Sequence, residues 1–297
     1  MYRYNNNNLF NSTKQAGLYY AIMICAFIIV SFLGQTVLSA IGVKNNTVIY
    51  IVNSLFSFIA IVGVKIYADF SLKTRSKFFR HFKKFKPKYA FYALLFFTGM
   101  FLGFGFINSL IAKIVELLGG SYSSIDLNLD SPITLVLFSI FLALLPALTE
   151  EIFFRGLLQE SFSKNNRAMT ALSISLAFAL YHGSIVQLVY QFIFALGLSF
   201  LVFQSGSILP SIIAHFLNNF CVLIIEYFKI PLNPFNPLVI ILGLVILLAF
   251  ALLMLYDKNA KTNETERKSG TIKQFWLPFG LVGAIICLLL IISGMVL

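Results

Sequence analysis

The sequence predicts an all-α polytopic membrane protein with about eight or nine transmembrane helices, on three observations. Hydrophobic residues make up 59% of the 297 residues, and the mean hydropathy is +0.88. Apolar stretches of about twenty residues, the length that a helix needs to cross a hydrocarbon core of ~30 Å, recur along the whole chain. Only 11% of the residues are charged, and most of these lie between the apolar stretches. This composition is typical of integral membrane proteins and not of soluble domains.

The first half of the chain contains four predicted spans. Residues 1–16 are polar and rich in asparagine, so we expect a poorly ordered tail there. The apolar stretches then predict helices at Gly17–Ile41, Val48–Ala68, Tyr89–Leu118 and Pro132–Leu148. The last of these begins with a proline, which the first turn of a helix tolerates.

The second half contains five more predicted spans, which are separated by polar turns or prolines. These spans are Ala168–Ile185, Val186–Phe203, Pro210–Glu226, Leu238–Leu255 and Phe275–Leu297. The spans divide the chain into three helical regions that follow the tail. The regions are N-terminal helices at 17–125, a core at 130–230 and C-terminal helices at 238–297.

The loop at 72–88 carries the strongest positive cluster of the sequence. Its basic residues are Lys73, Arg75, Lys77, Arg80, Lys83, Lys84, Lys86 and Lys88. Basic loops remain on the cytoplasmic side, so we expect a multi-pass protein of the cell membrane with a cytoplasmic N-terminus. A helix in this loop would align Phe78, Phe82 and Phe85 and could lie on anionic lipid. The alternative is a loop that only sets the topology.

The formal net charge of +11 does not indicate nucleic-acid binding. Its basic residues cluster in the loops between predicted spans, where the topology rule explains them, and no nucleic-acid motif accompanies them. We therefore expect the lipid bilayer and membrane-associated peptides or proteins as partners, and no nucleic acid.

Two carboxylates and a guanidinium follow the apolar run of the fourth predicted span. An ionisable group at membrane depth costs about 2.5–3.5 kcal/mol on insertion scales, so it indicates a functional site. Glu151 and Arg155 are four residues apart and can form an ion pair on one helix face, whereas Glu150 points about 100° away. A desolvated glutamate without such a partner can serve as a general base. Because the apolar run ends at Leu148, we expect both carboxylates near the cytoplasmic boundary.

Two of the three histidines lie in predicted spans. His182 follows Phe178 by four residues, so the phenyl ring can fix the orientation of the imidazole. His215 precedes Asn219 by four residues, which places an imidazole and a carboxamide on one helix face, and the adjacent Asn218 is expected to point elsewhere. Each residue alone could be a polar packing residue between helices. A shared chemistry with the glutamates explains them together more economically.

Three short motifs therefore lie in order on successive hydrophobic segments. They are Glu150-Glu151-x-x-x-Arg155, Phe178-x-x-x-His182 and His215-x-x-x-Asn219. This order resembles the signature of the CPBP family, which comprises CaaX prenyl endopeptidases and bacteriocin-processing proteins and is also called the Abi family. The resemblance covers about residues 130 to 230, and no motif position departs from it.

The resemblance implies an intramembrane endopeptidase. Its substrate would be a CaaX-type protein, a peptide pheromone precursor or a bacteriocin precursor. Glu150 would activate water, and His182 would assist or hold that water. His215 and Asn219 would donate hydrogen bonds to the oxyanion of the tetrahedral intermediate. Orienting roles would fall to Glu151, Arg155 and Phe178.

The family is also described as metalloproteases, and zinc could take Glu150, His182 and His215 as ligands. However, the His-Glu-x-x-His spacing is absent, and a zinc-bound Glu150 would leave the site without its base. We therefore expect no cofactor, with zinc as the alternative. Two other functions stay open: a non-proteolytic scaffold in the cell envelope or in bacteriocin immunity, and a transporter with a polar midplane site.

Overall fold

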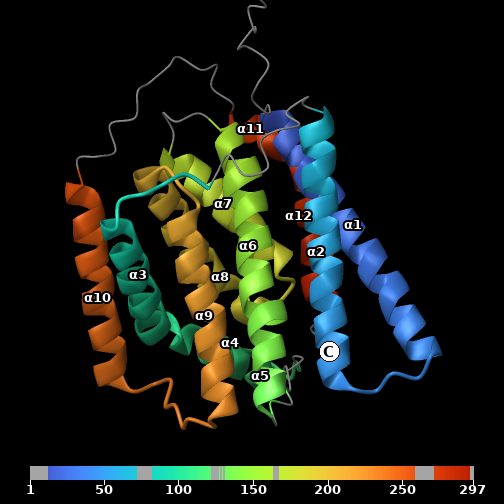
Figure 1. Ribbon diagram of the computed structural model, residues 1–297, viewed down its shortest axis with the longest axis horizontal. Helices are drawn as coiled ribbons and strands as arrows, with labels where there is room; N and C mark the ends of the chain where they lie inside the picture. Colours follow the sequence, from blue (N-terminus) through green and yellow to red (C-terminus); the bar gives the residue numbers. More distant parts are fainter. Residues whose placement is uncertain are drawn as a thin grey trace, which may run out of the picture.

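The computed structural model describes residues 13–71, 82–121, 127, 129, 131–162, 167–257 and 271–294. This part of the chain is a bundle of helices without strands (Figure 1). The helices are α1 Thr13–Ala40, α2 Asn46–Ser71, α3 Lys88–Phe104, α4 Phe106–Leu117, α5 Pro132–Phe138, η2 Ser139–Leu144, α6 Leu145–Glu150, η3 Glu151–Leu158, η4 Gln159–Ser161, α7 Arg167–Tyr181, α8 Ile185–Ser205, α9 Leu209–Tyr227, α10 Pro237–Tyr256, α11 Ile272–Phe275, η7 Trp276–Gly280 and α12 Leu281–Gly294.

Eight of the described helices, some of them built from several consecutive segments, are long and apolar enough to cross a membrane. The predicted all-α polytopic class is therefore confirmed. The fifth predicted span, Ala168–Ile185, needs correction, because the corresponding α7 has only 15 residues, or roughly 22 Å of helix. The chain leaves α7 at Tyr181, turns through Gly183 with a positive φ of 61° and enters α8 at Ile185. His182 therefore lies in a turn and not inside a span.

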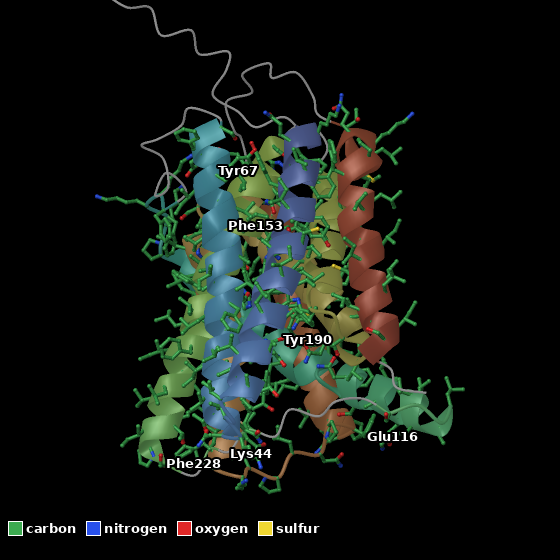
Figure 2. The ribbon with its side chains drawn as sticks, turned by 90° about the vertical axis from the view of Figure 1, so that its right-hand side faces the viewer. Lys44, Tyr67, Glu116, Phe153, Tyr190 and Phe228 are labelled. Atoms are coloured by element: carbon green, nitrogen blue, oxygen red, sulfur yellow. The ribbon has the colours of Figure 1, made fainter. Side chains whose placement is uncertain are left out.

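The third predicted span, Tyr89–Leu118, is broken at Gly105 into α3 and α4. A Cβ atom at this glycine would lie 2.6 Å from the carbonyl oxygen of Phe101, so only glycine allows this close approach of the two helical turns. Figure 2 shows α4, which carries Glu116 near its end, leaning away from the direction of the long helices. The sequence pattern of apolar residues continues across the break and does not reveal it.

The fourth span begins as predicted but ends later. Ser131 caps α5 in a capping box with Thr134, and Pro132 follows in the first turn. Instead of ending at Leu148, the helix continues through η3 and η4 to Ser161. The two glutamates thus lie within the span, with about eleven residues or roughly 16 Å of helix beyond them. The expected position of both glutamates near the cytoplasmic boundary stays a prediction. The residues from Thr149 to Gln159 are buried by neighbouring helices.

Three segments between helices contain basic residues: 72–81, 163–166 and 258–270. The helix ends that flank these segments lie at the same end of the bundle. α2 and α10 end there, and α3 and α7 begin there (Figure 1). The basic segments themselves, at 72–81, 163–166 and 258–270, lie outside the described residues. We call this end of the molecule the basic end.

The aromatic residues of the basic loop contact the protein. Phe82 packs against the buried cluster of Ile152, Ile208 and Ile212, and Phe85 packs against a second buried cluster that includes residues of α3 and α8. Residues 82–86 are not helical. The predicted lipid-facing stripe is therefore wrong for these two phenylalanines, and Phe78 lies outside the described residues. The lysines at 83, 84 and 86 are exposed beside them.

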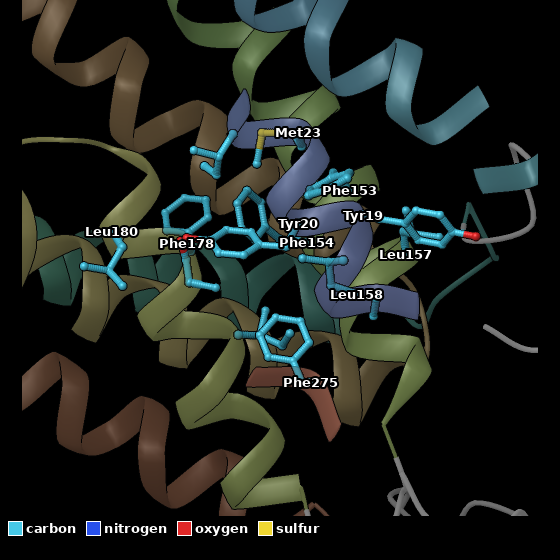
Figure 3. Close-up of a cluster of buried hydrophobic side chains, with 14 of the residues drawn as sticks. Tyr19, Tyr20, Met23, Phe153, Phe154, Leu157, Leu158, Phe178, Leu180 and Phe275 are labelled. Carbon is cyan, nitrogen blue, oxygen red and sulfur yellow. The ribbon is translucent and has the colours of Figure 1, made fainter. Parts of the chain in front are cut away.

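A cluster of aromatic rings holds η3 against its neighbours (Figure 3). Phe154 lies at its centre, with ring centroids 5.1 Å from Phe178 in α7 and 6.5 Å from Tyr20 in α1. Phe275 of α11 lies 6.1 Å from the Tyr20 ring and closes the cluster. The segment that carries both glutamates is thus fixed by large rings from distant parts of the chain, which bury much apolar area.

The first prediction concerns the close contact of α3 and α10. We expect Gly243→Ala to lower the free energy of unfolding by about 1–3 kcal/mol, the usual range for overpacking. A Cβ atom there would lie 2.1 Å from the backbone nitrogen of Gly103, so the two helices would have to separate. Thermal unfolding of the detergent-solubilised protein measures the effect. Gly63→Ala in α2, which meets nothing within 4 Å, is the matched control and should unfold no earlier than wild type. Equal midpoints for both variants would contradict the close contact.

Candidate active site

The two glutamates lie where the helix changes type. Glu150 is the last residue of α6, and Glu151 is the first residue of η3, which is π-helical. A π-helical turn is wider than an α-helical turn, redirects side chains and occurs often at functional sites. All eight residues of η3 are buried. The local fold therefore directs two acids and one arginine into the bundle.

Glu151 and Arg155 form the predicted ion pair. Nη1 of Arg155 lies 2.8 Å from Oε1 of Glu151, and both side chains are completely buried. Nη2 of Arg155 donates to the carbonyl oxygen of Ala195 in α8 at 3.2 Å. The guanidinium also lies 4.6 Å from the centre of the Phe178 ring in α7, at cation–π distance. Arg155 thus connects η3 to α7 and α8.

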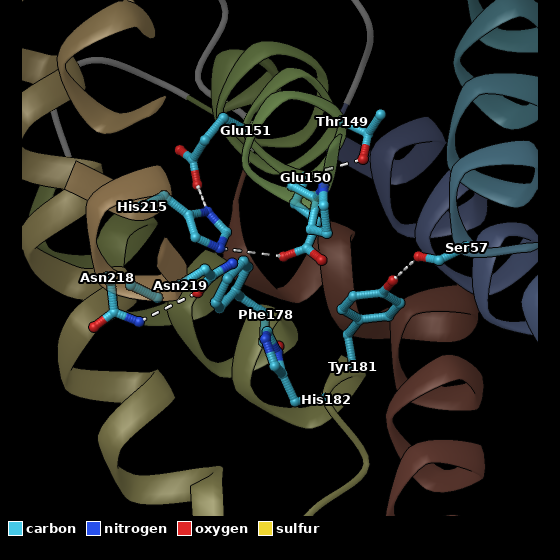
Figure 4. A network of polar contacts seen from close by, with 12 residues as sticks. Ser57, Thr149, Glu150, Glu151, Phe178, Tyr181, His182, His215, Asn218 and Asn219 are labelled. Atoms are coloured by element: carbon cyan, nitrogen blue, oxygen red, sulfur yellow. Dashed lines mark hydrogen bonds and ion pairs between the residues drawn. The ribbon is translucent and has the colours of Figure 1, made fainter. Parts of the chain in front are cut away.

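Glu151 also determines which ring nitrogen of His215 donates a hydrogen bond. Nδ1 of His215 lies 3.0 Å from Oε1 of Glu151. A carboxylate that is ion-paired with arginine can only accept hydrogen bonds, so Nδ1 must carry the proton that is shared in this contact. The imidazole therefore presents Nε2 on its other side. Nε2 lies 3.8 Å from Oε2 of Glu150 (Figure 4).

Glu150 is the carboxylate without a close partner. Its residue is only 6% exposed, and its buried Oε2 has no hydrogen-bond partner among the described residues. The 3.8 Å separation from His215 exceeds a hydrogen bond, and a water molecule beside the line joining the two atoms could contact both. The predicted division between a paired Glu151 and an unpaired Glu150 is present in the structure.

His182 reaches the same region from the end of α7. Its Nδ1 lies 2.9 Å from the carbonyl oxygen of Phe178, which can only accept, so Nδ1 donates and Nε2 remains an acceptor. The Phe178 ring lies between two imidazoles, with centroids 4.6 Å from His182 and 5.8 Å from His215. His182 reaches the two-imidazole contact with Phe178 because α7 is short. After only 15 residues the helix ends, and His182 follows directly in the turn.

In Figure 4, Asn219 lies on the other side of the Phe178 ring from His182. Its Oδ1 accepts a hydrogen bond from Nδ2 of Asn218 at 3.3 Å, and Oδ1 of Asn218 accepts one from the Tyr190 hydroxyl at 2.6 Å. The expectation that Asn218 points elsewhere is therefore wrong, because the two neighbouring carboxamides contact each other. The structure brings the buried Glu150 and His215 and the partly buried Asn219 into one region, with His182 against the shared phenyl ring (Figure 4).

The side chains do not form a ready zinc site. Within the described residues, no group of three or more His, Cys, Asp or Glu side chains converges closely enough to hold a metal ion. Nδ1 of His215 is engaged with Glu151 and Nδ1 of His182 with a backbone carbonyl, which leaves Nε2 of each imidazole as the nitrogen that a metal could take. The described side chains of Glu150, His182 and His215 are too spread out to be grouped as a metal site, and the zinc alternative stays a prediction.

Sequence reasoning missed three contributors to this region. Tyr190 contacts Asn218 from another helix, and no spacing in the sequence connects two residues that are 28 positions apart. Tyr181 lies beside Glu150 in Figure 4 and shares a hydrogen bond with Ser57 of α2. Tyr181 adjoins a motif histidine, which is a weak signal, whereas Ser57 carries none.

The fold and these contacts define a polytopic membrane protein with a cluster of carboxylate, imidazole and carboxamide groups, contributed by α6, η3, α9 and the turn after α7. Residues 132–221, from α5 into α9, match the model of the family described as type II CAAX prenyl endopeptidase Rce1-like. This match contains every motif position and confirms the resemblance to the CPBP family, a family of CaaX-type intramembrane endopeptidases. No curated protein and no solved structure matches the chain significantly.

The second prediction concerns the buried ion pair. We expect Arg155→Met to lower the free energy of unfolding by about 3–5 kcal/mol, because the buried Glu151 would lose its counter-ion. The double variant Glu151→Gln/Arg155→Met should recover part of this loss, since no unpaired charge remains. Thermal unfolding in detergent measures both.

The matched control for this prediction is Lys229→Met. Lys229 pairs with Glu226 at 3.5 Å on the surface, with 74% and 46% of the two side chains exposed, and such pairs contribute about 0–1 kcal/mol. A loss for Arg155→Met no larger than that of the control would contradict a structural role for the buried pair.

Proposed function

We propose that this protein is an intramembrane endopeptidase in which Glu150 activates a water molecule. The observation that carries the proposal is the buried Glu150 carboxylate, which has one oxygen without a partner and faces His215 Nε2 at 3.8 Å. A water molecule held by a general base and an imidazole is one arrangement that can hydrolyse a peptide bond. The family match over the same helices supports this reading.

In the proposed reaction, Glu150 takes a proton from water while the water oxygen attacks the scissile carbonyl carbon. The carbonyl π electrons move to oxygen and form the oxyanion. When the intermediate collapses, the C–N bond breaks and Glu150 returns the proton to the leaving nitrogen. Nε2 of His182, an acceptor in its inferred tautomer, holds a hydrogen of the attacking water.

His215 and Asn219 stabilise the oxyanion in this proposal. Because Nδ1 of His215 donates to Glu151, a hydrogen bond from Nε2 to the oxyanion requires a proton on both ring nitrogens when the oxyanion forms. With that proton, the buried cluster contains two carboxylates and two cations, Arg155 being the second, and carries no net charge. A neutral cluster suits an apolar interior far better than a charged one. Asn219 contributes its Nδ2 group as the other donor.

The substrate in this proposal is a membrane-associated peptide or protein: a CaaX-type protein or a precursor of a peptide pheromone or bacteriocin. We place the protein in the cell membrane with the basic end in the cytoplasm, because exposed lysines at 83, 84 and 86 lie there. These lysines also fit contact with anionic lipid headgroups.

The third prediction tests the base. Glu150→Gln is isosteric and should lower the rate of peptide cleavage by about 10²–10⁴-fold, the usual contribution of a general base. His182→Ala should also abolish cleavage, because the water loses its second contact. The assay uses proteoliposomes and an internally quenched peptide with a prenylated CaaX tail. Glu116→Gln, an exposed glutamate of α4, is the matched control and should retain full activity.

Thermal unfolding of the same variants separates loss of chemistry from loss of fold. Full activity of Glu150→Gln or of His182→Ala would refute the mechanism. If Glu150→Gln fully replaced the wild-type protein in a deletion strain, the non-proteolytic scaffold would be the better reading.

The fourth prediction concerns metal. We expect purified protein to contain far less than one zinc ion per chain and to keep its cleavage rate after treatment with a chelator, because the donor set does not converge on one point. Metal analysis and the quenched-peptide assay measure the two quantities. Loss of activity on chelation, restored by added zinc, would require a rearranged site and would overturn the metal-free mechanism.

A further inference from the structure

Tyr190, Asn218 and Asn219 form a chain of hydrogen bonds from α8 to the candidate active site. The Tyr190 hydroxyl donates to Oδ1 of Asn218 at 2.6 Å, and Nδ2 of Asn218 donates to Oδ1 of Asn219 at 3.3 Å. Tyr190 and Asn218 are buried, with exposures of 5% and 7%. Figure 4 shows Asn219 extending from α9 towards Glu150, with Asn218 on its other side.

This chain determines which end of the Asn219 carboxamide faces the site. The tyrosine hydroxyl has only one hydrogen, and it is used on Oδ1 of Asn218. A reversed Asn218 could donate to the hydroxyl oxygen, but the buried hydroxyl hydrogen would then lose its acceptor, so the amide group of Asn218 points to Asn219, whose Oδ1 accepts it. The remaining end of Asn219 is Nδ2, a donor. Tyr190 thereby fixes the orientation of a carboxamide that it does not touch.

We propose that Tyr190 and Asn218 are positioning residues that hold the Nδ2 group of Asn219 towards the oxyanion. The inference deepens the proposed function and rests on it. A carboxamide has nearly the same shape when it is turned by 180°, so packing alone does not choose its orientation. A reversed Asn219 would direct its oxygen at the developing negative charge. Donors that are fixed before the reaction avoid this reorganisation.

A purely structural role for the tyrosine is the competing explanation. The Tyr190 ring stacks on Phe194 with centroids 6.0 Å apart, and a buried hydroxyl needs an acceptor wherever it lies. The two explanations differ in their consequences. A structural role predicts that loss of the hydroxyl changes stability, whereas a positioning role predicts that it changes the rate of the chemical step through Asn219.

The fifth prediction tests this difference with Tyr190→Phe, which keeps the ring. We expect kcat to fall about 10-fold with KM unchanged, a part of the 10²–10³-fold loss expected for Asn219→Ala. Asn218→Asp should lose more, because a carboxylate cannot donate to Oδ1 of Asn219 and instead attracts its Nδ2. Tyr19→Phe, which removes a hydroxyl bonded to Ser71 at 2.6 Å, is the matched control with unchanged kcat.

A double-mutant cycle decides whether the effect passes through Asn219. In the Asn219→Ala background, Tyr190→Phe should change kcat less than twofold, because no carboxamide remains to be oriented. An equal fold loss in both backgrounds would overturn the positioning role. Unchanged kcat of Tyr190→Phe in the wild-type background would overturn it as well.

A spectroscopic measurement separates failure of this inference from failure of the proposed function. In protein labelled with ¹⁵N-asparagine in nanodiscs, Tyr190→Phe should shift the side-chain NH₂ signals of Asn219, which are assigned by their absence in Asn219→Ala. Tyr19→Phe should leave them in place. Absence of the shift overturns the hydrogen-bond chain whether or not the protein cleaves peptide. If the shift is clear but the protein cleaves no peptide, the hydrogen-bond chain is supported. The catalytic role of that chain is then overturned together with the proposed function.

Discussion

The buried contact of Glu151 with Arg155 and His215 is the interaction on which the site depends. Each charge would be unfavourable alone inside a bundle surrounded by lipid, and the pair is tolerated because the partners lie 2.8 Å apart. Arg155 also binds the Ala195 carbonyl and the Phe178 ring. Through this ion pair and its neighbours, contacts connect four elements, η3, α7, α8 and α9. The side chains of the candidate site owe their positions in part to these contacts.

The same contact divides the work between two adjacent acids. Oε1 of Glu151 is engaged by both a guanidinium and an imidazole, which hold this carboxylate in place, while its Oε2 is buried and has no hydrogen-bond partner among the described residues. Glu150 is also buried but has no such close contact, and it faces His215 across a gap longer than a hydrogen bond. Adjacent positions on a helix differ in direction by about 100°, and the change from α6 to the π-helical η3 occurs between these two residues. Helix geometry thus gives two adjacent carboxylates different surroundings: Glu151 is ion-paired, and Glu150 is the one to which the proposal assigns the chemistry.

The sequence was sufficient for those features that depend on local spacing. The apolar stretches predicted the class of fold, and the four-residue spacing predicted the pair of Glu151 with Arg155. Features that depend on tertiary contacts were not predictable in this way. The helix continues past Leu148 because neighbouring helices bury polar residues that a hydropathy pattern assigns to the surface. Gly105 breaks a uniformly apolar run, and Phe82 packs against Ile208 although its loop is basic. The hydrogen bond between Tyr190 and Asn218 joins α8 to α9. It depends on how the two helices are rotated against each other, which local sequence spacing does not predict.

Helices outside the family match also support the candidate site. Tyr20 of α1 donates to the Ala177 carbonyl at 3.1 Å, one residue before Phe178, and its ring packs on Phe154. Ser57 of α2 holds the hydroxyl of Tyr181. Both helices precede the matched segment, yet they support η3 and the end of α7 from the side opposite α8 and α9. The proposed mechanism needs its carboxylate kept from bulk solvent and from lipid alike, and the helices outside the match contribute to the enclosure around Glu150.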